Sequence, residues 1–296
     1  MKNKVTEILG CKYPIVQGAM GVICNPELVA AVSEAGGFGL LATALTERTE
    51  VLREQIKAIK NLTSKPFGAN LFLMNPLAEK FANVLAEEGV EAVTVSGGSP
   101  RTLIPVLHKL GIRALAVVPT VKVALNAETH GADAIVAEGS ESGGVQGYQG
   151  ASTMVLTPMV VDFVKVPVLA AGGIGDSRGY KAALALGAEG VQVGTRFIAS
   201  KECIAHINYK NIIVRASESA TELVDLGRFR IRALLTPLVE KLIEAERVEN
   251  DFFEGKAMKD SWLKGDTAAG ILPAGQISGL VHKVLTAKEI IEEMVS

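Results

Sequence analysis

The chain has 296 residues, of which 48% are hydrophobic and 21% are charged, and its 30 basic residues nearly balance its 32 acidic ones. This is the composition of a folded globular protein, long enough to bury one large α/β core or two smaller ones. Without an extended lysine or arginine run, the sequence gives no electrostatic footprint for nucleic acid or an anionic membrane.

The cysteines and the start of the chain exclude further classes. Cys11, Cys24 and Cys203 are far apart and form no CxxC pair, so neither a disulfide framework nor a thiolate metal site is indicated. The start, MKNKVTEILG, is charged where a signal peptide would be apolar. No apolar stretch reaches the roughly 18 residues that a membrane span needs. We therefore expect a cytoplasmic protein without a metal.

Short apolar runs rich in β-branched residues recur along the first two-thirds of the chain. They lie at Pro14–Gln17, Gly39–Ala42, Phe67–Leu71, Ala92–Val95, Ala114–Val118, Ala134–Ala137, Val168–Ala171 and Gly190–Val193. Most are continuous rather than alternating in polarity, which is typical of parallel strands buried on both faces.

Amphipathic stretches of helical length separate these runs. Among them are Pro26–Glu34, Glu50–Lys60, Leu77–Glu88, Pro100–Leu110, Val121–Thr129 and Ser177–Leu186. Several end at a glycine, which is typical of a left-handed helix C-cap: Gly36, Gly89, Gly111, Gly131 and Gly187.

The alternation of strand and helix favours a TIM (β/α)8 barrel, since it recurs about eight times and this barrel has eight such units. The alternative is a doubly wound open sheet, whose dinucleotide-binding form carries GxGxxG after its first strand. Here the first strand runs into QGAMGV, which does not complete that fingerprint. From about Lys201 the strand rhythm stops and the remainder is interpreted as helices. We expect a barrel over residues 1–200 and a helical extension over residues 201–296 that packs on it.

Glycine and small polar residues cluster where the predicted strands end. In a parallel barrel this carboxyl end holds the active site. Gly172-Gly173 and Gly194-Thr195 follow the last two strands, where barrels often bind phosphate through backbone N–H groups. The alternative is that these glycines only allow tight turns. Their occurrence at adjacent strands favours a phosphate site.

Four runs carry a family resemblance: PIVQGAMG, AEGSESGG, VPVLAAGGIGDSRG and GAEGVQVGTRFIASKE. They resemble the nitronate monooxygenase (2-nitropropane dioxygenase) family, which also includes the flavin-dependent enoyl-ACP reductase II enzymes. The resemblance extends to GDTAAGILPAGQISGL near the end of the chain. It implies that the barrel of residues 1–200 binds FMN and that residues 201–296 contribute to the cofactor site.

The resemblance also implies which residues contact FMN. By position these are Gly172, Gly173, Gly194 and Thr195 at the phosphate; Ala19 and Met20 against the isoalloxazine; Asn70 and Gln192 hydrogen-bonded to the flavin or its ribityl chain; Glu138, Gly143 and Gly144 along the sixth-strand loop; and Gln276 approaching the ring from the C-terminal segment. Because aromatic residues make up only 5% of the chain, we expect a pocket of backbone and aliphatic groups.

One departure from the family pattern concerns catalysis. The sixth-strand loop of the family usually reads GGH, with the histidine on the substrate side of the flavin, and here that position is Val145. Valine cannot exchange a proton, so the sequence assigns no catalytic residue.

Three functions are compatible with these features. The preferred one is an FMN-dependent oxidoreductase of the nitronate monooxygenase type, because a nitronate arrives already deprotonated. The first alternative is an enoyl-ACP reductase II that uses NADH or NADPH, and the second is a flavin-binding protein with lost or altered catalysis. The expected partner is a small-molecule substrate or an acyl thioester. The sequence leaves the oligomeric state open, with a homodimer among the alternatives.

Overall fold

The computed structural model describes residues 3–148, 150–227, 229–245 and 256–296. Its central feature is a sheet of eight parallel strands in the order β1-β9-β8-β6-β5-β4-β3-β2. The strands are β1 (Ile15–Gln17), β2 (Gly39–Ala42), β3 (Phe67–Phe72), β4 (Ala92–Ser96), β5 (Arg113–Val118), β6 (Ala134–Glu138), β8 (Val168–Ala171) and β9 (Gly190–Val193). Every predicted strand is present within one residue of its expected ends.

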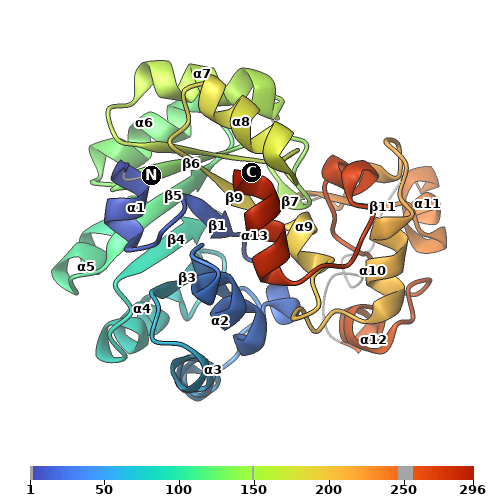
Figure 1. Ribbon diagram of the computed structural model, residues 1–296, viewed down its shortest axis with the longest axis horizontal. Helices are drawn as coiled ribbons and strands as arrows, with labels where there is room; N and C mark the ends of the chain where they lie inside the picture. Colours follow the sequence, from blue (N-terminus) through green and yellow to red (C-terminus); the bar gives the residue numbers. More distant parts are fainter. Residues whose placement is uncertain (1–2, 149, 228, 246–255) are drawn as a thin grey trace.

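The two edge strands of this sheet meet and nearly close it. Val16 and Phe38 form a parallel bridge. The N–H of Phe38 donates to the carbonyl of Ile15 at 2.9 Å, and the N–H of Gln17 donates to the carbonyl of Phe38 at 2.9 Å. Since Phe38 directly precedes β2, these bonds join β1 to β2. The TIM-barrel prediction is therefore confirmed (Figure 1).

Small and branched side chains fill the inside of the barrel. They are Val16, Leu40, Ala92, Leu115, Ala134, Val136, Leu169 and Ala171. Helix α1 (Lys4–Leu9) adds Val5 and Leu9 to this cluster and lies at the amino ends of the strands, where Arg113 donates to the carbonyl of Ile8. The interior is therefore a packed core closed at one end, which leaves the carboxyl end open for a site.

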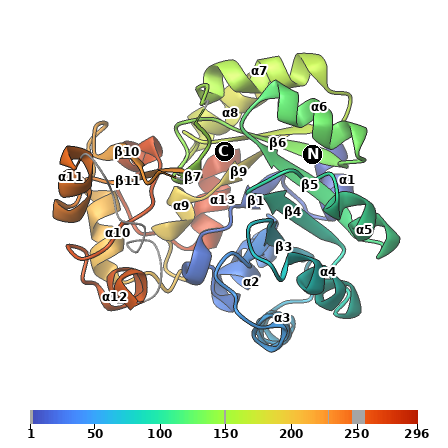
Figure 2. The same ribbon diagram turned by 180° about the vertical axis from the view of Figure 1, so that it is seen from behind.

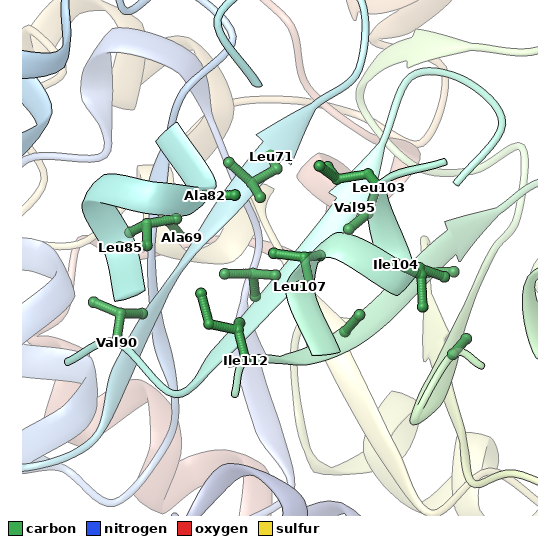
Figure 3. Close-up of a cluster of buried hydrophobic side chains, with 14 of the residues drawn as sticks. Ala69, Leu71, Ala82, Leu85, Val90, Val95, Leu103, Ile104, Leu107 and Ile112 are labelled. Carbon is green, nitrogen blue, oxygen red and sulfur yellow. The ribbon is translucent and has the colours of Figure 1, made fainter. Parts of the chain in front are cut away.

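Helices surround the sheet. They are α2 (Pro26–Glu34), α3 (Thr49–Leu62), α4 (Ala78–Glu87), α5 (Leu103–Lys109), α6 (Val121–Thr129), α7 (Thr153–Phe163) and α8 (Ser177–Ala185). Figure 3 shows part of the apolar layer between sheet and helices, in which Leu71 and Val95 of the strands lie near Leu85, Leu103 and Leu107 of α4 and α5. The predicted glycine caps all have positive φ. No helix in the described ranges is long and apolar enough to cross a membrane.

The C-terminal third is not wholly helical, contrary to the sequence prediction. Its helices are α9 (Thr195–Ile198), α10 (Ile207–Val214), α11 (Pro237–Glu244), α12 (Lys256–Lys264), the short η3 (Gln276–Leu280) and α13 (Ala287–Val295). Between them β10 (Thr221–Asp225) and β11 (Arg230–Leu234) form an antiparallel hairpin, and β11 also pairs with β7 (Gly144–Gln146). Charged residues interrupt both strands, TELVD and RIRAL, so the apolar pattern does not reveal a pairing that depends on a distant loop.

The last helix completes the ring of helices around the barrel. Strand β9 is followed only by the four-residue α9, and α13 packs between α8 and α2 (Figure 1). The chain thus returns to the barrel after forming the additional sheet and helices, which Figure 2 shows to one side of it. The predicted division at residue 200 separates the barrel strands from the rest, but not the barrel helices.

Gly39→Ala tests the close packing of α2 on β2. A Cβ at Gly39 would lie 2.3 Å from the carbonyl oxygen of Val29, which is backbone and cannot move cheaply. We expect a loss of about 3 kcal/mol in the free energy of unfolding. The comparison is Gly89→Ala, where φ is +68° and a Cβ meets nothing within 4 Å, so that about 1 kcal/mol of backbone strain is expected. Equal losses in urea unfolding would contradict the packing.

Candidate functional site

A cavity of about 760 Å³ opens at the carboxyl end of the barrel, a volume typical of small-molecule sites. The sequence-predicted site residues that line it are Ala19, Met20, Asn70, Glu138, Gly143, Gly144, Gly172, Gly173, Gln192, Gly194 and Thr195. They come from the carboxyl ends of five barrel strands, β1, β3, β6, β8 and β9, and from the loops that follow them. The fold therefore brings these residues together as the barrel prediction requires.

Gln276 is placed differently from the expectation. Its side chain is exposed and does not line the cavity, whereas its neighbours Gly275 and Ile277 do. The backbone N–H of Gln276 donates to the carbonyl of Glu141 at 2.9 Å and attaches this segment to the sixth-strand loop. The C-terminal segment thus reaches the site, but Gln276 contributes its backbone rather than its amide.

The turn after β8 exposes backbone to the cavity. Gly172 and Gly173 have φ of 98° and 72°, and a Cβ on Gly172 would lie 2.9 Å from the carbonyl oxygen of Gly139. Because glycine has no Cβ, a bound anionic group can approach the backbone N–H groups of this turn closely. Among the residues described, no Lys, Arg or His lines the cavity. An anionic group here would therefore be held by backbone N–H groups and hydroxyls.

Thr195, at the end of β9, connects the barrel to the C-terminal segment. Its hydroxyl oxygen accepts a hydrogen bond from the N–H of Gly275 at 2.9 Å, and its own hydroxyl hydrogen is still available to a ligand. Gly275 in turn approaches the carbonyl of Glu141 so closely that a Cβ would lie 2.6 Å from it. This tight junction fixes one wall of the cavity.

Asn70 is held by the neighbouring strand. It is 5% exposed, and its amide nitrogen donates to Thr94 Oγ1 and to Ser96 Oγ, both at 3.0 Å. Thr94 and Ser96 also line the cavity. Thr94 was missed at the sequence level, although a lone polar residue inside the apolar run AVTVS was a usable signal. The three side chains form a polar, fixed part of the cavity wall.

Gln192 carries an unsatisfied acceptor. Its Oε1 is buried and has no hydrogen-bond partner among the described residues, and the side chain lines the cavity. A buried carbonyl without a partner costs free energy that a ligand N–H or O–H would recover. This atom therefore fits a bound group with a hydrogen-bond donor, such as the flavin implied by the family resemblance.

Glu138, at the end of β6, is an ionisable group on the cavity wall. Ser142 Oγ donates to its Oε1 at 3.0 Å, and Gln146 donates to Ser142 Oγ. The residue is half-buried and lines the cavity. Burial raises the pKa of Glu138 to about 7, and the hydrogen bond from Ser142 limits the increase. Its carboxyl group thus changes charge near neutral pH.

The expectation of a pocket without aromatic groups is wrong. The aromatic residues that line the cavity are Phe72, Tyr148, Tyr209, Phe229 and Trp262. All but Phe72 come from the sixth-strand loop, the β10–β11 hairpin and the C-terminal helices. Composition counts aromatic residues but does not locate them, and the fold concentrates the few that exist around this cavity.

Tyr148 and the β10–β11 hairpin together form part of the cavity wall. The Tyr148 hydroxyl donates to the carbonyl of Gly227 at 2.9 Å, and the Arg230 guanidinium lies over the Tyr148 ring, 5.2 Å from its centroid. Val145, on β7, pairs with Ile231 of the hairpin and lines the cavity, so the family's histidine position is occupied by an aliphatic group facing the site.

No histidine of the described residues lines the cavity, and two of them have structural contacts. His206 caps α10, where its ring accepts from the N–H of Asn208 at 3.2 Å, and Gly265 packs directly against the ring. His108 Nε2 lies 3.0 Å from Asp133 Oδ2, and neither of these residues lines the cavity. None of the described residues form a group of three or more His, Cys, Asp or Glu that could hold a metal ion.

Comparison with known proteins identifies the family. The nitronate monooxygenase family model matches residues 2–296, and the chain belongs to this family. It is 32% identical to a (3aS,4S,5R,7aS)-5-hydroxy-7a-methyl-1-oxo-octahydro-1H-indene-4-carboxyl-CoA dehydrogenase of Rhodococcus jostii, covering 100% of this chain and 95% of that protein. It is 31% identical to a probable nitronate monooxygenase of Staphylococcus saprophyticus, covering 100% and 97%. The structure of FabK from Thermotoga maritima matches with a TM-score of 0.94 and 39% identity, covering 100% and 95%. These relatives support an oxidoreductase.

Glu138→Gln tests the burial of this carboxyl group. The folded state raises the pKa of Glu138 from 4.5 to about 7, so the folded protein binds the proton more tightly than the unfolded chain does. This contribution to stability is complete below pH 4.5 and is lost as the pH rises through 7. Glutamine keeps the bond from Ser142 without ionising. Relative to wild type, the ligand-free variant should gain about 2–3 kcal/mol between about pH 5 and about pH 8 in denaturant unfolding. A pH-independent difference would contradict the burial.

Proposed function

We propose that the chain is an FMN-dependent oxidoreductase that reduces the carbon–carbon double bond of an α,β-unsaturated acyl thioester with electrons from NADH or NADPH. The observation that carries this proposal is the size of the cavity together with an apolar part of its lining, to which Met74, Leu226, Phe229 and Ile277 contribute. A large cavity with such a lining suits an acyl chain better than a small nitronate. The likeness to FabK, an enoyl-ACP reductase II, points the same way.

The residues of the cavity fit FMN. Gly172, Gly173 and Gly194, with the hydroxyl of Thr195, would hold its phosphate, and the unpartnered Oε1 of Gln192 would accept from one of its donor groups. The backbone supplies the donors, since no cation lines the described cavity wall. When bound, FMN supplies hydride-transfer chemistry.

Asn70 would hydrogen-bond the flavin or its ribityl chain, as the family resemblance implies. Its hydrogen bonds to Thr94 and Ser96 hold its amide in one orientation. Tyr148 and Phe229, from two separate segments, bring aromatic surface to the cavity wall. This surface would cover the thioester and exclude water from the reacting carbons.

Nitronate oxidation, which the sequence analysis preferred, is the second candidate. Two observations favour it: the family model and the 31% identity to a probable nitronate monooxygenase. The aliphatic Val145 is compatible with a substrate that needs no base. Nitronate oxidation is placed second because a nitronate is small, whereas the cavity is large and partly apolar in its lining.

Gln192→Met tests the cofactor assignment through two effects of opposite sign. The change removes a buried unpaired carbonyl and keeps a similar unbranched shape. The free energy of unfolding of the ligand-free protein should therefore rise by about 1 kcal/mol. FMN should bind about 10-fold more weakly, because one hydrogen bond to the cofactor is lost. Calorimetric titration and urea unfolding measure both. Unchanged FMN affinity would remove Gln192 from the cofactor site.

Anaerobic mixing of the FMN-loaded protein with candidate substrates tests the reaction. We expect NADH or NADPH to bleach the flavin absorbance and an α,β-unsaturated acyl thioester to restore it, because the thioester accepts the electrons. Bleaching by a nitronate alone would instead support the second candidate. A flavin that none of these compounds reduces would indicate a binding protein with lost catalysis. Protein that does not bind FMN would overturn the proposal.

A further inference from the structure

The hydrogen bonds around Glu138 have a defined direction. Gln146 Nε2 lies 3.1 Å from the carbonyl oxygen of Ser142, which can only accept. This contact fixes the orientation of the Gln146 amide, because the opposite orientation would bring two acceptors together. The same nitrogen, which carries two hydrogens, also donates to Ser142 Oγ.

The orientation of the Gln146 amide determines how Ser142 hydrogen-bonds to Glu138. Because Ser142 Oγ accepts from Gln146, its single hydrogen is available to Glu138 Oε1, which lies 3.0 Å away. Oε1 is therefore the acceptor oxygen of the carboxyl group. When Glu138 carries a proton, the proton is on Oε2, and the Glu138 side chain is part of the cavity lining.

We propose that Glu138 is the side chain that gives a proton to the substrate, through Oε2, and that Ser142 and Gln146 are positioning residues that keep Oε1 as an acceptor. This inference rests on the proposed reduction of an unsaturated acyl thioester. It assigns a proton-transfer role to a residue that family resemblance connects only with cofactor contact.

The proton transfer balances the reaction. A bound FMN reduced by NADH or NADPH would supply the hydride that forms a C–H bond at the β-carbon, and the electron pair of the double bond would move toward the thioester carbonyl. The Oε2–H bond of Glu138 then breaks as a C–H bond forms at the α-carbon. The product is the saturated acyl thioester, and Glu138 is left as a carboxylate that water protonates again.

The nearby charged side chains of Glu141 and Arg232 form hydrogen bonds to partners other than Glu138. Glu141 Oε2 accepts from the backbone N–H of Thr153, at the start of α7, and from its hydroxyl at 2.8 Å. Arg232, on β11, donates from Nε to the carbonyl of Ser140 at 2.9 Å. Neither residue acts on the pKa of Glu138, which is governed by burial and the Ser142 bond.

The tyrosines of the cavity are not competing acids. The Tyr209 hydroxyl donates to the carbonyl of Pro273, and burial raises its pKa well above 10. Burial and Asp225 raise the pKa of Tyr148, whose hydroxyl is bonded to the hairpin. The strands beside β6 contribute apolar residues and glycine to this wall. Glu138, with a pKa of about 7, is the cavity-lining acid that is protonated in part of the molecules at neutral pH.

Glu138→Gln in the FMN-loaded protein separates hydride supply from proton supply. Bleaching by the nicotinamide should slow much less than reoxidation, because no substrate proton is involved in that step. Reoxidation by a crotonyl thioester should slow about 100-fold and lose its dependence on pH. Glu54→Gln, a change of the same type at an exposed position on α3, is the matched control and should behave as wild type.

Ser142→Ala tests the positioning role. Removal of its hydrogen bond should raise the pKa of Glu138, because that bond favours the carboxylate. The pH midpoint of reoxidation should therefore move upward, while the rate at low pH stays within about 10-fold of wild type. A rate loss without movement of the midpoint would assign Ser142 a merely structural role and overturn this part of the inference.

Infrared difference spectroscopy provides a readout without the cofactor. Ligand-free wild type should show a protonated carboxyl band that titrates near pH 7, and the band should be absent in Glu138→Gln. Absence of a titrating band in wild type would overturn the inference. So would a Glu138→Gln protein that reoxidises at the wild-type rate with the wild-type pH profile. If Glu138→Gln does not bind FMN, the pH midpoint of reoxidation in Ser142→Ala tests the inference instead: an upward move supports it, and an unchanged midpoint overturns it. Wild type that the thioester does not reoxidise would instead overturn the proposed function.

Discussion

The closure of a parallel hydrogen-bonded sheet is the constraint on which the rest of this molecule depends. Once the backbone around Phe38 bonds to β1, the inward side chains of all eight strands share one enclosed volume, and they fill it. Helix α1 occupies the amino end. Groups that must meet a ligand can then lie only where the strands end, and the cavity is found there.

The rest of the chain builds on that rim. The loop after β6 extends as β7 and pairs with the β10–β11 hairpin, while the segment around Gly275 is bonded to Thr195 and to Glu141. The chain then returns to the barrel as α13. Three segments far apart in sequence are thus joined at one cavity, so a change at any of these junctions affects the shape of the site.

Sequence patterns predicted the features that depend on residue type at a single position or along a short segment. Continuous apolar runs marked the barrel strands, and the glycines at 172, 173 and 194 marked the rim, because buried strands and close backbone approach restrict the residue types allowed. The β10–β11 hairpin was missed because β11 pairs with β7, which is distant in sequence. The outward position of Gln276 and the aromatic lining were also missed. Each depends on how distant segments pack, which neither periodicity nor composition records.

Trp262 gives the cavity wall an optical property. It is the only tryptophan of the chain, it is 4% exposed, and its indole N–H donates to the carbonyl of Ile271 at 2.7 Å. Because it lines the cavity, all of the tryptophan emission of this protein originates at the candidate site. A flavin bound there would absorb that emission by energy transfer. The unlabelled chain therefore carries a built-in reporter of occupancy, whose brightness follows the contents of the cavity.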